Sequence, residues 1–265
     1  MSSSAPFGGG AIAAAAASAS GRPGLSPDAT AGVSERVRFI RLTYLHLFGA
    51  ILLFAGLEWL LMKNAFVIEH VSVPILRFAL GDRYNWLVVL ALYMAVGYVA
   101  DYWARHATSR AMQYAGLILY VIAEAVIFLP LLVLAEMQAA DYLRATGKEA
   151  HIIRDAAFLT LAIFGALTAS VLITKKDFSF MRGALAIASG AALMLIVISI
   201  IAGFNLGILF SVAMVLLAAG YVLYYTSQVL AHYNPQQYVA AALALFSAVA
   251  LMFWYIIRIL MKLRE

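Results

Sequence analysis

The chain has no cysteine and little charge: Asp, Glu, Lys and Arg make up only 12% of its 265 residues. The absence of cysteine excludes disulfides, thiolate metal sites and cysteine nucleophiles. Soluble domains contain about 25% charged and roughly 45–50% apolar residues. Because 65% of this chain is hydrophobic, a soluble fold would leave a large apolar surface in water. The composition therefore predicts a protein embedded in a lipid bilayer.

Several motifs of enzymes and binding domains are also missing. The sequence has no Gly-x-Ser-x-Gly turn and no glycine-rich phosphate loop, and its five histidines do not form the i, i+4 pair of a helical metal site. The 18 basic residues are scattered between apolar segments instead of forming a stripe. We therefore expect no enzymatic activity, no cofactor, no metal and no nucleic-acid partner.

Seven apolar stretches follow residue 36, and each is close to the roughly 20 residues that cross a bilayer as a helix. Unbroken apolar runs without strand-type alternation favour helices over a barrel. The sequence thus predicts an all-α integral membrane protein, a seven-transmembrane-helix bundle forming one domain over residues 35–265. The expected spans are Leu42–Met62, Asn85–Trp103, Met112–Leu134, Asp155–Thr174, Gly183–Ala202, Gly207–Leu230 and Tyr238–Met261.

Residues 1–34 differ in composition from the rest, being almost all Ala, Ser, Gly and Pro. This segment lacks the basic start of a signal peptide, so we expect a disordered tail that stays attached. The Lys and Arg residues divide equally between the two sides, nine on each. The tightest basic clusters, Arg36–Arg41 and Lys175–Arg182, fall on the side of the N-terminus, which favours an N-terminus inside.

The stretch ITKKDFSFMRG, residues 173–183, interrupts the apolar sequence with Lys175, Lys176 and Asp177. No other polar groups are expected to converge on this loop. We interpret it as a positive anchor at the membrane surface and not as a catalytic site.

Four segments resemble the Bax-inhibitor family of membrane proteins. FLTLAIFGALTASVLITKKDFSFM resembles the end of the family's fourth span, and RFIRLTYLHLFGAI resembles its opening helix. GLILYVIAEAVIFLPLL is similar to the third span, including Pro130, and QYVAAALALFSAVALMFWYIIRIL to the last span, including Arg258. The resemblance covers about residues 36–262.

This resemblance implies a central helix surrounded by the others and a role in membrane stress or cell-death control. It also implies a cation or proton leak, as in some members, or binding to a membrane-bound AAA protease, as in some bacterial ones. The similarity to bacterial-type members implies a location in the inner (cytoplasmic) membrane.

The chain departs from the family at two acidic positions to which the leak is attributed. The first aspartate belongs to a Leu-Tyr-Asp-Thr-Ser pattern, which here reads LYYTS and places Tyr225 at the acid's position. The second lies ten residues before the arginine of the last helix, where this chain has Ala248. Two close carboxylates share a proton because both cannot ionise in a low dielectric. Without them, the family's pH-gated mechanism is in doubt.

Three other acids lie within the predicted spans and are candidates for an ion or proton pathway: Glu124, Asp101 and Glu58. Glu124 lies near mid-bilayer, where a charge costs about 2.5 kcal/mol or more, so we expect it to be largely protonated. Its helical face also holds Gly116 and Tyr120, and the face of Asp101 holds Tyr93 and Gly97, so the two faces are expected to form one polar seam. Asp101 and Glu58 lie near span ends and are expected to reach the interface.

Three functions are consistent with this sequence. The first is a Bax-inhibitor-type membrane protein with an altered or lost cation or proton leak. The second is a non-conducting regulator that binds another membrane protein, such as a quality-control protease. The third is a small transporter with Glu124 as a proton relay. A neutral buried hydrogen bond is the alternative role for Glu124.

Overall fold

A computed structural model describes residues 33–82, 84–106 and 109–264, and every regular element among them is helical. Seven helices are long and apolar enough to cross a membrane, which confirms the predicted seven-helix all-α class. They are α2 (Val33–Lys63), α5 (Asn85–His106), α6 (Arg110–Thr146), α7 (Ile152–Thr174), α8 (Arg182–Ala202), α9 (Gly207–Ala231) and α10 (Tyr238–Lys262). The predicted tail lies outside the described residues, except that its last two positions, 33 and 34, begin α2.

Two helices are longer than their apolar stretches. Helix α2 begins at Val33 instead of Leu42, and α6 continues beyond Leu134 to Thr146. Charged residues are excluded from the hydrocarbon core but not from a helix, so hydropathy underestimates helix length at both places. Helix α6 ends where Gly147 takes a left-handed conformation and donates its backbone N–H to the carbonyl of Leu143 at 2.8 Å.

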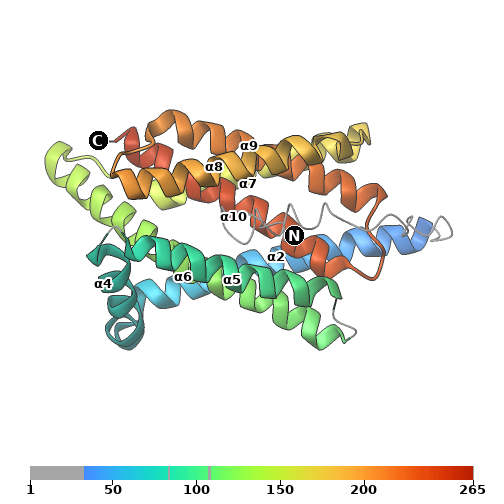
Figure 1. Ribbon diagram of the computed structural model, residues 1–265, viewed down its shortest axis with the longest axis horizontal. Coiled ribbons are helices and arrows are strands. Elements are labelled where there is room, and N and C mark those ends of the chain that lie inside the picture. The colour runs from blue at the N-terminus through green and yellow to red at the C-terminus, as the bar shows by residue number, and fades with distance from the viewer. Residues whose placement is uncertain (1–32, 83, 107–108, 265) are drawn as a thin grey trace.

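The connection between the first two spans is folded, which the sequence analysis did not predict. It contains α3 (Ala65–Val67), the π-helical turn η1 (Ile68–Ser72) and α4 (Val73–Gly81). The Ser72 hydroxyl is buried and donates a 2.6 Å hydrogen bond to the carbonyl of Leu61 near the end of α2. This bond holds the short helices against one end of the bundle (Figure 1).

Helix α10 is the centre of the bundle. It packs against α2, α5, α6, α7 and α9, and every residue from Tyr238 to Ala250 is buried. Six of those thirteen residues are alanine, and such small side chains let neighbouring helices approach closely. The central helix implied by the family resemblance is therefore present.

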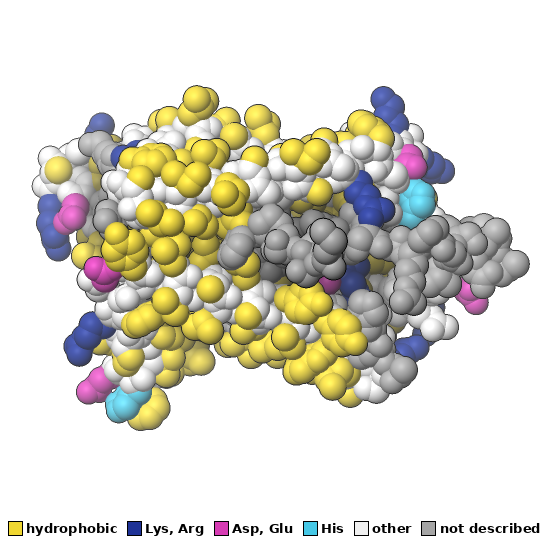
Figure 2. Space-filling model, in the orientation of Figure 1, with side chains coloured by type: hydrophobic (Ala, Val, Ile, Leu, Met, Phe, Trp, Pro, Cys, Tyr) yellow, Lys and Arg dark blue, Asp and Glu magenta, His cyan; other side chains and the backbone are white. Residues whose placement is uncertain are grey.

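The bundle has two polar ends. The α4 end holds the last turns of α2, α6 and α10, and the α7–α8 end holds the connection with the 3-10 turn η2 (Ser179–Met181). Figure 2 shows hydrophobic side chains across the middle of one face, with charged side chains gathered towards both ends. Such a band is what contact with a lipid bilayer requires.

Candidate functional site

The predicted seam between α5 and α6 is present around Glu124. This residue is only 3% exposed, and its carboxyl oxygen Oε1 accepts a 2.5 Å hydrogen bond from the hydroxyl of Tyr93. The Tyr93 and Tyr120 hydroxyls lie 3.1 Å apart. Spacing of four residues along each helix correctly predicted that these side chains share one interface.

A cavity of about 430 Å³ reaches Glu124 from the α4 end. Its walls come from α5, α6, α8, α9 and α10 and are mainly apolar. Its polar side chains include Tyr93, Glu124, Ser199, Asn205, Tyr255 and Arg258. Because Asn205 lies in the α8–α9 connection, the cavity extends from that connection to the carboxyl of Glu124.

Towards the α7–α8 end the same seam is closed by backbone packing. A Cβ atom built on Gly116 would lie 2.5 Å from the carbonyl oxygen of Ala100, so the two helices are in direct contact there. Asp101, the next residue on α5 after Ala100, is 5% exposed and accepts a 2.6 Å hydrogen bond from Nε of Arg105. Asp101 therefore lies beside the closed section and in an ion pair, and the expectation that it reaches the membrane surface is wrong, because helix packing buries it.

Glu58 lies outside this seam. It is on α2, is 5% exposed, and lines a second cavity of about 520 Å³ between α2, α6, α7 and α10. No described residue forms a hydrogen bond with either of its carboxyl oxygens. The expectation that Glu58 turns out towards the membrane surface is wrong, because helix packing buries it.

The two positions of the missing aspartates are buried and uncharged. Tyr225 is 1% and Ala248 3% exposed. The Tyr225 ring packs on those of Tyr221 and Tyr224, with centroids 5.7 Å and 5.3 Å away.

The Lys175–Asp177 loop is exposed and organised by its own hydrogen bonds. Lys175 ends α7 in a left-handed conformation, with a φ of 51°. Asp177 accepts hydrogen bonds from the hydroxyl and the backbone N–H of Ser179, at 2.5 Å and 2.8 Å. These bonds stabilise the charged carboxylate and hold the pKa of Asp177 below its ordinary value.

The loop also contacts α9, which the sequence analysis missed. The backbone N–H of Phe178 donates to the hydroxyl of Ser227 at 3.2 Å, and the side-chain amide of Gln228 donates to the Ser179 hydroxyl at 2.8 Å. The residues of the LYYTS segment and of the loop are far apart in sequence, so neither segment alone indicates this contact.

The comparisons with known proteins agree with this architecture. A family model described as "Inhibitor of apoptosis-promoting Bax1" matches residues 36–265. The chain belongs to the Bax-inhibitor-1 family. The match covers all the described residues from Arg36 onward, so the membership applies to the whole bundle. No curated protein matches the chain significantly.

At the two positions to which the resemblance assigns aspartates, this chain has Tyr225 and Ala248, and its buried carboxyls lie instead on α2, α5 and α6. Of these, Glu124 lines the cavity at the α4 end, Asp101 is paired with Arg105, and Glu58 opens into a separate cavity.

Proposed function

We propose that this Bax-inhibitor family member is a slow proton leak in which Glu124 takes over from the missing aspartate pair. The observation that carries the proposal is the buried carboxyl of Glu124, at the inner limit of a cavity and hydrogen-bonded to Tyr93. A carboxyl can bind and release a proton without moving a larger ion through the bundle. We expect no enzymatic chemistry from this arrangement.

The surroundings of Glu124 fit a gated path. The Tyr93 and Tyr120 hydroxyls extend the hydrogen-bonded chain by two groups on the α5–α6 interface. Arg258 and Tyr255 of α10 are ionisable groups that line the same cavity as Glu124. A proton enters from the α4 end and stops at the contact between Gly116 and Ala100, so flux requires a transient separation of α5 and α6.

We place the protein in the bacterial cytoplasmic membrane with its N-terminus inside, where a slow leak would relieve membrane stress. The basic residues of the α7–α8 connection and of the start of α2 lie at one end of the bundle, and this arrangement supports the orientation.

The closed α5–α6 contact and the absence of both family acids also support a second function. In this alternative the bundle conducts nothing and regulates another membrane protein, such as a quality-control AAA protease. The exposed α7–α8 connection, held in shape by Asp177 and Ser179, would supply a defined surface for such a partner.

Reconstitution in lipid vesicles tests the leak. Purified protein is placed in vesicles containing a pH-sensitive dye, and proton entry is driven by a potassium diffusion potential. We expect proton entry above that of empty vesicles and its loss in Glu124→Gln, because the amide keeps the shape but cannot release a proton. Glu149→Gln, an exposed acid at the α4 end, is the control and should conduct like the natural chain.

Restoring the family acids separates the two functions. The double variant Tyr225→Asp with Ala248→Asp should gain pH-dependent flux if the rest of the family pathway is intact. Silence of both the natural chain and the folded double variant, together with co-purification of a membrane protease, would support the regulator.

A further inference from the structure

The cavity beside Glu58 has no part in the proposed leak. Its volume of about 520 Å³ falls within the range of roughly 300–1,000 Å³ typical of small-molecule sites. Its walls are mostly apolar side chains of α2, α6, α7 and α10. Glu58 lies five residues before Lys63, the last residue of α2, so its backbone is about 7.5 Å below the helix end at 1.5 Å per residue.

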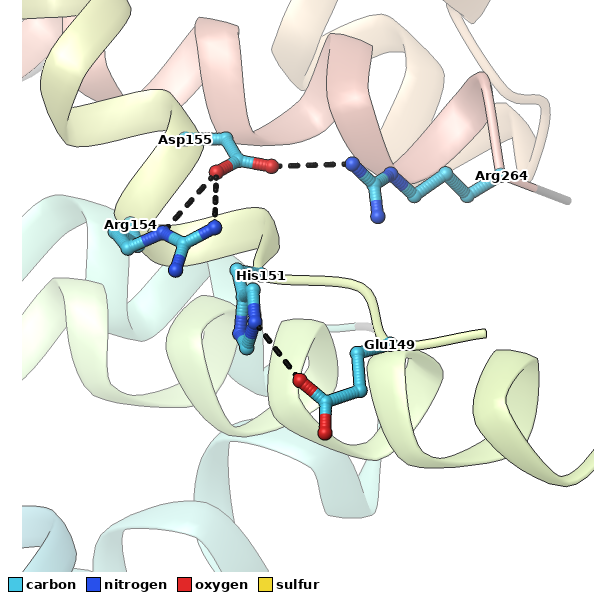
Figure 3. A network of polar contacts seen from close by, with 5 residues as sticks. All are labelled: Glu149, His151, Arg154, Asp155 and Arg264. Atoms are coloured by element: carbon cyan, nitrogen blue, oxygen red, sulfur yellow. Dashed lines mark hydrogen bonds and ion pairs between the residues drawn. The ribbon is translucent and has the colours of Figure 1, made fainter. Parts of the chain in front are cut away.

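The charged groups around the mouth of this cavity are paired with one another. Nζ of Lys63 lies 3.1 Å from Glu136, and both side chains are about half exposed. Figure 3 shows neighbouring pairs near the start of α7: His151 lies 3.2 Å from Glu149 in the α6–α7 connection, and Asp155 of α7 lies between Arg154 and Arg264, which follows α10. The charged side chains at the mouth therefore have partners within the chain and do not need a ligand to pair with.

Glu58 is different, because it is buried and its two oxygens have no hydrogen-bond partner among the described residues. A buried carboxyl without a partner is costly. A ligand with a positive charge would remove that cost, whereas an anionic one would be repelled.

Aromatic side chains line the same cavity as Glu58. Phe54 of α2 and Phe246 and Phe253 of α10 line the cavity, and the Phe54 ring centroid lies 6.1 Å and 6.4 Å from the other two. Aromatic rings attract organic cations through their negative faces. A metal cation such as Ca²⁺ would need six to eight oxygen ligands, which this apolar wall does not offer.

We propose that this cavity binds a lipophilic organic cation, with its charged centre beside Glu58 and its apolar substituents against the aromatic wall. The proposal goes beyond the proton leak and does not depend on it, since it uses a different carboxyl and a different cavity.

Binding of tetraphenylphosphonium to the full-length protein in lipid nanodiscs tests the proposal by equilibrium dialysis. We expect saturable binding, weakened at least about tenfold in Glu58→Gln because the buried charge partner is lost. Asp141→Asn is the matched control. It removes one exposed negative charge at the same end of the bundle and outside the cavity, so binding should change by less than roughly twofold.

Two further measurements distinguish the contribution of the ligand's charge to binding from that of its shape. Triphenylphosphine oxide, a neutral compound with similar rings, should compete poorly for the site. Ala139→Trp, which fills the cavity without changing a charge, should abolish binding while the thermal unfolding curve shows a folded protein. Equal binding of the cation to Glu58→Gln and to the natural chain, or equal competition by the neutral compound, would overturn the proposal.

Discussion

Glu124 and Glu58 are both carboxyls buried inside the helical bundle, 3% and 5% exposed, yet their surroundings differ. Glu124 lines the cavity of about 430 Å³ at the α5–α6 interface and accepts a short hydrogen bond from Tyr93. Glu58 opens into the larger cavity, where no described residue forms a hydrogen bond with its oxygens. The two carboxyls are equally buried, but only Glu124 has a described hydrogen-bond partner, and we propose that a ligand is the partner of Glu58.

The difference follows from how closely the neighbouring helices approach. Gly116 brings α5 and α6 into backbone contact, which places the tyrosines of both helices within reach of Glu124. Around Glu58 the four helices stay apart, and aromatic side chains fill only part of the space between them. A hydroxyl partner within the bundle suits Glu124 to a proton relay, and the lack of a described partner suits Glu58 to a ligand site.

The largest effect is expected at the contact that closes the Glu124 seam. In Gly116→Leu the new Cβ would lie 2.5 Å from the carbonyl oxygen of Ala100, and the rest of the side chain would clash with α5. We therefore expect a loss of about 3 kcal/mol in the free energy of unfolding. Denaturation in mixed micelles measures it. The control is Gly165→Leu on α7, where a Cβ meets nothing within 4 Å. An equal loss in both variants would show that α5 and α6 are not in contact there.

The two carboxyls should respond in opposite directions to leucine. Glu124→Leu removes the acceptor of the Tyr93 hydroxyl, and we expect a loss of about 1–3 kcal/mol in the free energy of unfolding. Glu58→Leu removes a buried polar group that has no described partner, so its stability should be unchanged or higher. Denaturation in mixed micelles measures the free energy of unfolding of both variants. A larger loss in Glu58→Leu than in Glu124→Leu would mean that Glu58, and not Glu124, has the hydrogen-bond partner within the bundle.

A smaller effect is expected from removing only the Tyr93 hydroxyl, which donates the hydrogen bond to Glu124. Tyr93→Phe keeps the ring and removes one hydroxyl, which we expect to cost about 1 kcal/mol of stability and to slow proton entry into vesicles. Tyr98→Phe on the same helix is the control, because its side chain is 64% exposed. If the two variants lose the same stability and conduct alike, the Tyr93–Glu124 bond has no special role.

Much of the fold and part of the site were predictable from local pattern. Runs of about 20 apolar residues identify spans without any knowledge of packing, and all seven are present. The seam around Glu124 followed from spacing, since Tyr120 and Glu124 share a helical face and Tyr93 and Asp101 share another. Their meeting required only that two adjacent helices pack together.

The features that were missed depend on contacts between distant segments. The cavity at Glu58 is built from four helices whose separation no local pattern encodes. The sequence analysis placed Glu58 near the membrane surface because it lies close to the end of a predicted span. Position along a span does not show which neighbouring helices cover a side chain. The α3–η1–α4 connection was missed because its helices are too short to appear as spans.

The smallest effect is expected at Asp177, an exposed carboxyl with well-defined partners, which serves as a reference for both buried ones. Because its pKa is lowered in the folded protein, it contributes stability above its ordinary pKa, and this contribution disappears as the pH falls through the lowered value. Water screens the site, so Asp177→Asn should cost less than about 1 kcal/mol at neutral pH and nothing in strong acid. Denaturation in mixed micelles at several pH values checks this. If Asp177→Asn lost as much free energy of unfolding at neutral pH as Glu124→Leu, the loop would stabilise the bundle through its contact with α9. Burial would then not explain the difference in stability effects among Asp177, Glu124 and Glu58.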